Sequence, residues 1–211
     1  MHKVEPVRNL DTVHDIEATL SRLDTPRGRR MFLLWEFGIH TGMRIGDLLK
    51  LRVSDVCGQR EIVFKPQKQR HYHKDGTQIP QYKLRYPIDP EGALIKVINA
   101  RVKGLPGQNP LFLSRKKTPG GQLRPITREQ ALEDMKEIAR ICNIKTPFGC
   151  HTMRKTFGYH FYQKNHDIAA LQKWFHHSAP EITLIYIGIA DDNLRKMAKS
   201  SPFKPSPDVI L

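Results

Sequence analysis

The sequence has only three cysteines, which are scattered along the chain and include no Cys-x-x-Cys pair: Cys57, Cys142 and Cys150. This odd and dispersed set excludes a disulfide framework and a cysteine-based structural zinc site, and it indicates a reducing compartment. The first ten residues contain no apolar run, so we expect no signal peptide. No stretch approaches the length of a membrane span, and we therefore expect a cytoplasmic protein.

Acidic residues are few compared with basic ones. The chain has 21 Asp and Glu against 35 Lys and Arg, which gives a formal net charge of +14. Such a surplus favours a polyanionic partner, because clustered cations gain from phosphate contacts and counterion release. A ribosome-associated or merely basic protein would have the same surplus. With 211 residues, the chain is long enough for one globular domain with a substantial core.

Internal repeats and long low-complexity segments are also lacking, so the elements have to be taken one by one. Apolar residues recur at helical spacing in three segments near the start, which are predicted as helices over 11–22, 29–39 and 44–51. Residues 61–65 and 82–88 alternate as strands do, and the segment 66–80 between them is polar and basic. Together they predict an antiparallel hairpin with a long basic tip.

Most of the remaining chain is predicted to be helical. A helix is expected from Asp89 to about Lys103, then a short extended piece at 111–114. Thr127 and Gln130 have the capping-box spacing, and so have Ser178 and Glu181. Helices are expected over 127–141, 151–164, 167–174, from 178, and over 191–199. The fold class is therefore mostly α (α+β), a helical bundle with a small antiparallel sheet.

Four segments carry candidate chemistry. They are T-G-M-R-I-G-D-L-L at 41–49, the hairpin at 61–88, H-T-M-R at 151–154 and H-S-A-P-E-I-T-L-I-Y at 177–186. Taken singly, each has a structural explanation: Arg44 can pair with Asp47 on one helix face, and a tyrosine is commonly a half-buried core residue. Only their combination and order point to a function.

In that combination the chain resembles the catalytic domain of the tyrosine recombinase (phage integrase) family. The family pattern is T-G-x-R-x-x-E-L-L, a lysine on a hairpin, H-x-x-R, L-G-H-S, and a tyrosine nine residues after that histidine. His177 and Tyr186 are nine residues apart, and the match spans about residues 10–190. Asp47 replaces the usual glutamate, and Thr152-Met153 replaces Asp-Leu. His176 replaces a glycine, and we expect it to crowd a turn where glycine often supplies a special backbone conformation.

The resemblance implies a site-specific recombinase that cleaves and rejoins DNA through a 3′-phosphotyrosyl intermediate. It assigns the nucleophile to Tyr186 and the grip on the phosphate to Arg44, Arg154 and His177. Two guanidiniums suit this task, since they bind phosphate oxygens bidentately and stay charged. His151 is the candidate base. We expect no metal ion in the reaction and no cofactor, because the arginines supply the electrostatic stabilisation.

A lysine on the hairpin is expected to protonate the leaving 5′ oxygen. Lys68 is the first candidate and Lys65 the alternative. Further basic residues are expected to contact DNA backbone phosphates, which position a protein without reading sequence. For the second loop among them, a solvated surface is an equally good interpretation. These residues are Lys65, Arg70, His71, His73, Lys74, Arg115, Lys116 and Lys117.

The expected domain division is a catalytic domain at 1–190 and a C-terminal helix and tail at 191–211, with no separate N-terminal core-binding domain. The partner is double-stranded DNA, with the protein associated with the nucleoid when bound. Self-association as a tetramer on DNA is expected, with the C-terminal helix either exchanged between subunits or folded back. Two alternatives stay open: DNA relaxation as in type IB topoisomerases, and a non-catalytic DNA- or RNA-binding protein with the same fold.

Overall fold

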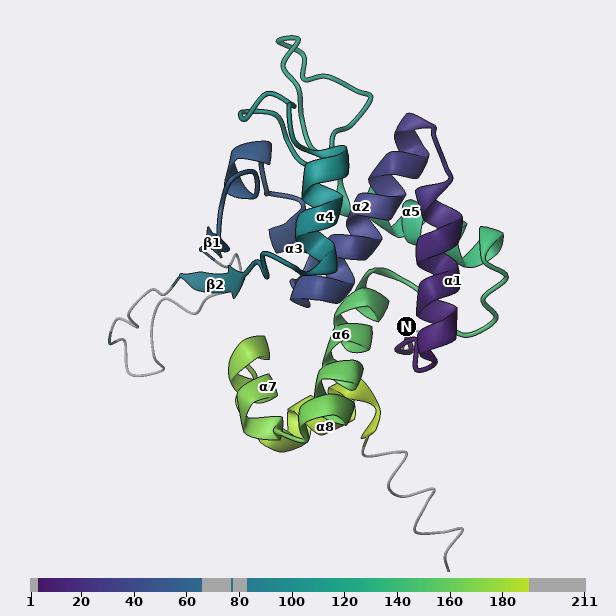
Figure 1. The fold of residues 1–211 in the computed structure, drawn as a ribbon, viewed down its shortest axis with the longest axis vertical. Helices are drawn as coiled ribbons and strands as arrows, with labels where there is room; N and C mark the ends of the chain where they lie inside the picture. The colour runs from purple at the N-terminus through teal and green to yellow at the C-terminus, as the bar shows by residue number, and fades with distance from the viewer. Residues whose placement is uncertain (1–3, 66–76, 78–82, 190–211) are drawn as a thin grey trace, which may run out of the picture. The chain divides into compact units, whose positions relative to one another are not determined.

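The protein, seen here as a computed structural model, is described for residues 4–65, 77 and 83–189 (Figure 1). Its contacts divide the chain into two compact units, Met1–Phe157 and Gly158–Leu211. The described residues contain eight α-helices and one two-stranded antiparallel sheet, which confirms the mostly α prediction. The expected division at residue 190 stays a prediction. Within the described ranges, no helix is both long and apolar enough to cross a membrane.

The first unit is built around α1 (Leu10–Ser21) and α2 (Pro26–Thr41), both close to their predicted bounds. The buried face of α1 consists of Val13, Ile16 and Leu20, the spacing that predicted the helix. This face joins a core cluster that includes Trp35 of α2. The Trp35 ring stacks on Phe148 at a centroid distance of 5.9 Å. Burial of such large side chains is the main stabilising term of the unit.

An ion-pair cluster holds α2 to α5 (Arg128–Ile141). The Asp134 carboxylate is 1% exposed and accepts hydrogen bonds from Arg27 and Arg30 of α2. Buried carboxylates need such paired partners. At the start of α5, Thr127 and Gln130 form the predicted capping box, with Thr127 N donating to Gln130 Oε1 at 3.0 Å.

The predicted antiparallel hairpin is present. The strand β1 (Glu61–Phe64) pairs antiparallel with β2 (Leu84–Pro87), and Ile62 lies opposite Tyr86. The tip, including the predicted site residues within 66–76, lies outside the described residues. Next along the chain, α4 (Ala93–Arg101) begins four residues later than predicted. The side chain of Asp89 instead accepts from Glu91 N at 3.0 Å, and this turn delays the helix.

The second unit contains the later part of α6 (Cys150–Asn165), α7 (Ile168–Phe175) and α8 (Pro180–Ile187). Asp167 caps α7 by accepting from Ala170 N at 2.8 Å. The predicted capping box at Ser178 is wrong. Ala179 is the N-cap of α8 and makes no side-chain bond, because Pro180 occupies the first helical turn and sets the start of the helix.

Candidate active site

A sharp turn after α2 positions Arg44. Gly42 ends the helix in the left-handed conformation with φ +63°, and a side chain there would also meet the ring of Phe157. Only glycine meets both demands without strain. Arg44 follows as the N-cap of α3 (Ile45–Leu48), which also carries the buried Asp47. The T-G-x-R motif is thus a helix end, a turn and a helix start in four residues.

The close approach of α2 and α6 positions Arg154. A Cβ on Gly38 would collide with the side chain of Met153, so the glycine lets the two helices approach. Arg154 follows Met153 on α6 and is 3% exposed. Its Nη1 donates to the carbonyl oxygen of Gly42 at 2.5 Å. Arg154 is therefore bound to the same turn from which Arg44 emerges.

Tyr86 connects this arginine group to the hairpin. The phenol oxygen accepts a hydrogen bond from the Arg154 side chain, and it interacts electrostatically with Arg44 and Asp47. Burial raises the pKa of Tyr86, against the lowering effects of the two arginines. Tyr86 is 3% exposed and its ring stacks on Phe64 at 5.6 Å. The base of the hairpin thus lies beside the arginines.

His151 lies one turn before Arg154 on α6 and is exposed. Lost hydration on its protein-facing side lowers the pKa of His151, and the charges of Arg154, Lys155 and Arg44 lower it further. The imidazole is therefore held in its neutral form at pH 7, in which one ring nitrogen can accept a proton. This is the protonation state that a general base requires.

The charges of this group are unbalanced. Three cations act electrostatically on His151: Arg154, Lys155 and Arg44. One carboxylate, that of Asp47, acts together with the two arginines on Tyr86. Arg154, Lys155 and Asp47 are each less than 5% exposed. A partly buried excess of positive charge is suited to a phosphate anion, since the interaction is little screened there.

The second unit holds His177 and Tyr186 together. Their ring centroids are 5.3 Å apart, and both rings lie against Phe175, which is fully buried. The hydroxyl of Thr183 is 2.9 Å from His177 Nδ1 and is itself buried. This hydrogen bond fixes the ring orientation and directs Nε2 away from Thr183. The nine-residue spacing therefore brings the imidazole and the phenol side by side.

The turn before His177 takes the special backbone conformation that the sequence comparison suggested. His176 is the C-cap of α7 and adopts the left-handed conformation with φ 50° and ψ 48°. His177 N then donates to Gln172 O, and Gln172 Nε2 donates to His177 O, both at 3.1 Å. A residue with a Cβ is strained in this conformation, but the two hydrogen bonds to Gln172 still hold the backbone of His177 in place.

The predicted site residues fall into two groups, one in each unit. Arg44, His151 and Arg154 come together in the first unit, and His177 and Tyr186 in the second. Lys65 is exposed just after β1, and Arg115, Lys116 and Lys117 are exposed in one loop. The remaining predictions lie outside the described residues: Lys68, Arg70, His71, His73 and Lys74.

Sequence reasoning missed three residues of these groups. Tyr86 and Lys155 contribute to the first group, and Thr183 to the second. The alternation of β2, with Leu84 and Tyr86 on its buried face, was the available signal for Tyr86. For Thr183 the signal was its position six residues after His177 on the predicted helix. Lys155 offers none, because buried lysines are rare.

Comparison with known sequences identifies relatives of the whole described fold. Residues 11–193 match the Phage integrase family. The chain is 35% identical over 199 residues to the probable integrase/recombinase YoeC of Bacillus subtilis, covering 94% of this chain and 97% of the relative. It is 27% identical to the tyrosine recombinase XerD of Staphylococcus saprophyticus, covering 90% of this chain and 62% of that protein.

Solved structures share the fold. The XerH site-specific recombinase, in a post-cleavage complex with its difH substrate, superposes with a TM-score of 0.63 at 18% identity, covering 94% of this chain and 54% of XerH. The catalytic domain of bacteriophage HP1 integrase gives a TM-score of 0.53 at 19% identity, covering 94% and 96%. The chain therefore spans little more than half of XerH but nearly all of an isolated catalytic domain.

Proposed function

This chain belongs to the phage integrase family, and from that premise we propose that it is a site-specific recombinase that cleaves and rejoins double-stranded DNA through Tyr186. The observation that carries the proposal is the cationic group of the first unit. Arg44 and Arg154 are over a hundred residues apart in sequence, yet Arg154 is hydrogen-bonded to the turn that presents Arg44. Such an arrangement is expected of a binding site for one phosphate.

The arginines stabilise the charge that develops during attack on a phosphodiester. Negative charge grows on the non-bridging oxygens, and each preorganised donor can contribute about 3 kcal/mol in the transition state. Arg44 and Arg154 supply the guanidiniums and His177 supplies a further donor. The bond between Arg154 and Gly42 O supports this role, because it holds the guanidinium before the phosphate arrives.

Tyr186 supplies the nucleophile. Its phenol oxygen forms a bond to the phosphorus atom while the bond from phosphorus to the 5′ oxygen breaks. The phenolic proton passes to the neutral imidazole of His151, whose lowered pKa supports the role of base. The resulting 3′-phosphotyrosine keeps the bond energy, so the reverse attack by a 5′ hydroxyl rejoins the strand without another energy source.

A hairpin lysine protonates the departing 5′ oxygen. Lys68 is the first candidate, and Lys65, exposed at the end of β1, is the alternative. The contact between Tyr86 and Arg154 supports this assignment, because it anchors the hairpin beside the arginines. Arg115, Lys116 and Lys117 contact backbone phosphates in this proposal, and so do Arg70, His71, His73 and Lys74.

The assembly and location follow from the same reaction. Recombination between two duplex sites cuts both strands of each site, which requires four active sites. The protein therefore acts as a tetramer on DNA, within the nucleoid of the cytoplasm. Solved relatives support DNA as the partner: the XerH structure contains its difH substrate, and a λ integrase structure is a dimer bound to a core site. The segment 191–211 is the proposed element exchanged between subunits.

Trapping of the covalent intermediate tests the proposal. The suicide substrate is a duplex with the sequence of the DNA that flanks the protein's own gene. It is nicked so that the fragment released by cleavage diffuses away. The chain should form a covalent adduct with the 3′ phosphate, and Tyr186→Phe should form none. Tyr162→Phe is the matched control, because Tyr162 also packs against a histidine, His166, at 5.8 Å.

Each outcome separates the alternatives. An adduct that persists in Tyr186→Phe contradicts the assignment of the nucleophile. An adduct with relaxation of supercoiled DNA but no strand exchange would favour the topoisomerase alternative. Binding without any adduct in the unsubstituted chain would favour the non-catalytic DNA-binding protein.

A further inference from the structure

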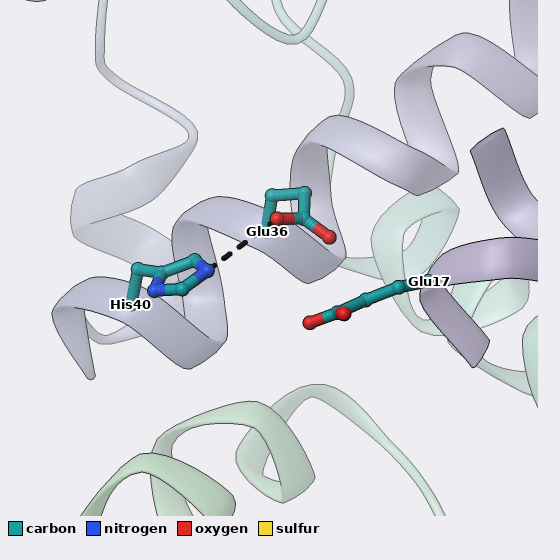
Figure 2. A group of neighbouring side chains, drawn as sticks. All are labelled: Glu17, Glu36 and His40. Atoms are coloured by element: carbon teal, nitrogen blue, oxygen red, sulfur yellow. Dashed lines mark ion pairs between the residues drawn. The ribbon is translucent and has the colours of Figure 1, made fainter. Parts of the chain in front are cut away.

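The first unit contains a second cluster of polar groups that the proposed reaction does not use. Figure 2 shows Glu17 on α1 facing Glu36 and His40 on α2. One ligand atom from each of these three side chains lies within 4.8 Å of the other two. None of the three was singled out from the sequence, because the pairing of α1 with α2 is what brings them together.

The buried carboxylate of Glu36 is the unusual member. The residue is 3% exposed, and its Oε1 has no hydrogen-bond partner among residues 4–65, 77 and 83–189. The other oxygen, Oε2, is 3.5 Å from His40 Nε2, which is too long for a good hydrogen bond. A buried carboxylate with so little compensation is costly, and it requires either a proton or a cation.

The charges around Glu36 favour a cation. Its neighbour Glu17 is half-buried, and one of its carboxylate oxygens lies within 4.8 Å of the Glu36 and His40 ligand atoms. Two carboxylates therefore face each other, with the imidazole of His40 beside them. A divalent cation would balance two carboxylates and leave the cluster neutral.

We propose that Glu17, Glu36 and His40 bind a divalent transition-metal cation of the zinc type, and that this cation fastens the C-terminal half of α2 to α1. One imidazole nitrogen and two carboxylate oxygens form a mixed set that Zn²⁺ accepts, whereas Mg²⁺ prefers oxygen alone. Water completes the coordination. The proposal concerns stability and is independent of the proposed recombinase reaction.

The geometry requires only a small adjustment. Zinc bonds of about 2.0–2.2 Å in a tetrahedral site separate neighbouring ligand atoms by roughly 3.4 Å. The observed upper limit of 4.8 Å therefore has to shrink by about 1.4 Å at most. The side chains of His40 and Glu17 can provide this movement, since neither is fully buried.

Thermal unfolding of the full 211-residue chain tests the proposal. The protein is first treated with EDTA and dialysed, then melted with ZnCl₂ or with MgCl₂. Because a ligand that binds only the folded state stabilises it, Zn²⁺ at about 100 times its Kd should raise Tm by roughly 5–10 °C. Mg²⁺ should change Tm much less. Titration calorimetry should give one high-affinity Zn²⁺ per chain.

Isosteric variants locate the site. Glu36→Gln should lose the zinc-dependent rise in Tm but keep or increase Tm without metal, because a buried and poorly compensated charge is removed. A purely structural role would instead lower Tm without metal. Glu17→Gln and His40→Gln, at less buried positions, provide the same test if Glu36→Gln fails to fold. Glu133→Gln is the matched control on the exposed face of α5, and it should keep the full rise.

Three results would overturn the proposal. The first is an unchanged Tm of the unsubstituted chain on addition of Zn²⁺, which would mean that the cluster binds no zinc. The second is an equally large rise of Tm in Glu17→Gln and Glu36→Gln, which would place the bound zinc on other histidines. The third is stabilisation by Mg²⁺ as large as that by Zn²⁺, which would exclude a site of this donor set.

Discussion

The two units hold their reactive side chains in different ways. In the first, Arg44, Tyr86 and Arg154 come from segments far apart in sequence, and buried contacts between α2, α6 and the hairpin position them. In the second, His177 and Tyr186 are nine residues apart and need only one turn, one short helix and the Thr183 hydroxyl. The proposed charge stabilisation thus depends on contacts of the core, whereas the proposed nucleophile depends on local structure.

This contrast predicts different consequences of substitution. Changes in the first group should affect both the rate of cleavage and the stability of the core. Changes around His177 and Tyr186 should affect the rate while the first unit keeps its stability. Five predictions test the contrast, beyond the adduct experiment with Tyr186→Phe.

The largest effect is expected for Arg44→Ala. Loss of one preorganised guanidinium should lower the rate of cleavage by roughly 100- to 1,000-fold. Binding of duplex DNA should weaken far less, because it depends on many phosphate contacts. Single-turnover cleavage and a binding titration measure the two effects. Arg60→Ala, at an exposed position just before β1, is the control, and equal losses in both variants would contradict the role of Arg44.

The pH dependence of cleavage should report on His151. Its pKa lies below the ordinary value of 6.5, so the neutral base persists at pH 7. The rate should be level around pH 7 and fall as pH drops through the lowered pKa, approaching tenfold per pH unit. His151→Gln should be slow and should lack this dependence. A wild-type rate that already falls between pH 8 and pH 7 would contradict the assignment.

The lowered pKa of His151 also makes the free energy of unfolding depend on pH. Since the folded pKa of His151 is below 6.5, the unfolded chain takes up the proton first. The free energy of unfolding should therefore decrease as pH falls from 6.5 to the folded pKa, and this contribution should stay constant above and below that window. Urea unfolding of the wild type and of His151→Gln measures the difference.

A smaller effect is expected for Thr183→Val. The substitution removes the hydrogen bond to His177 Nδ1 with little change of volume, and a net hydrogen bond corresponds to roughly a 3- to 10-fold change in rate. Thr183→Ser should restore the rate, which separates a positioning role from simple packing. If Ser and Val variants cleave equally fast, the hydroxyl does not orient the imidazole.

The smallest effect is expected for His176→Gly. The left-handed conformation strains a residue with a Cβ, so glycine should stabilise the protein by about 0.5–1 kcal/mol. Gly42 has the same position at the end of α2, where Gly42→Ala should destabilise instead, because φ and the ring of Phe157 both oppose a side chain. Urea unfolding of both variants compares the two helix ends directly, and destabilisation by His176→Gly would contradict the strain argument.

Local signals in the sequence predicted much of the fold. The apolar spacing of Val13, Ile16 and Leu20 gave α1, and Thr127 with Gln130 gave the start of α5. The same kind of signal failed at Ser178, because Pro180 sets the start of α8 without a side-chain cap. Caps are local and compete with neighbouring backbone preferences, so a spacing match alone is ambiguous.

The candidate site was predictable where a motif spans few residues. The spacing between His177 and Tyr186 is such a case, and the structure brings their rings together. Tyr86 and the cluster of Glu17, Glu36 and His40 were not predictable, because tertiary packing alone makes them neighbours. Pairwise proximity between distant segments has no signature in one sequence.

The hydrogen bond from Arg154 to the carbonyl oxygen of Gly42 connects both guanidiniums to the same turn. Arg44 leaves the turn two residues after the carbonyl that accepts the Arg154 hydrogen bond, so we expect a shift of that turn to displace both guanidiniums. A substitution that tilts the C-terminal end of α2 would therefore displace the two guanidiniums together. We expect it to change the activity while the distance between them stays nearly the same.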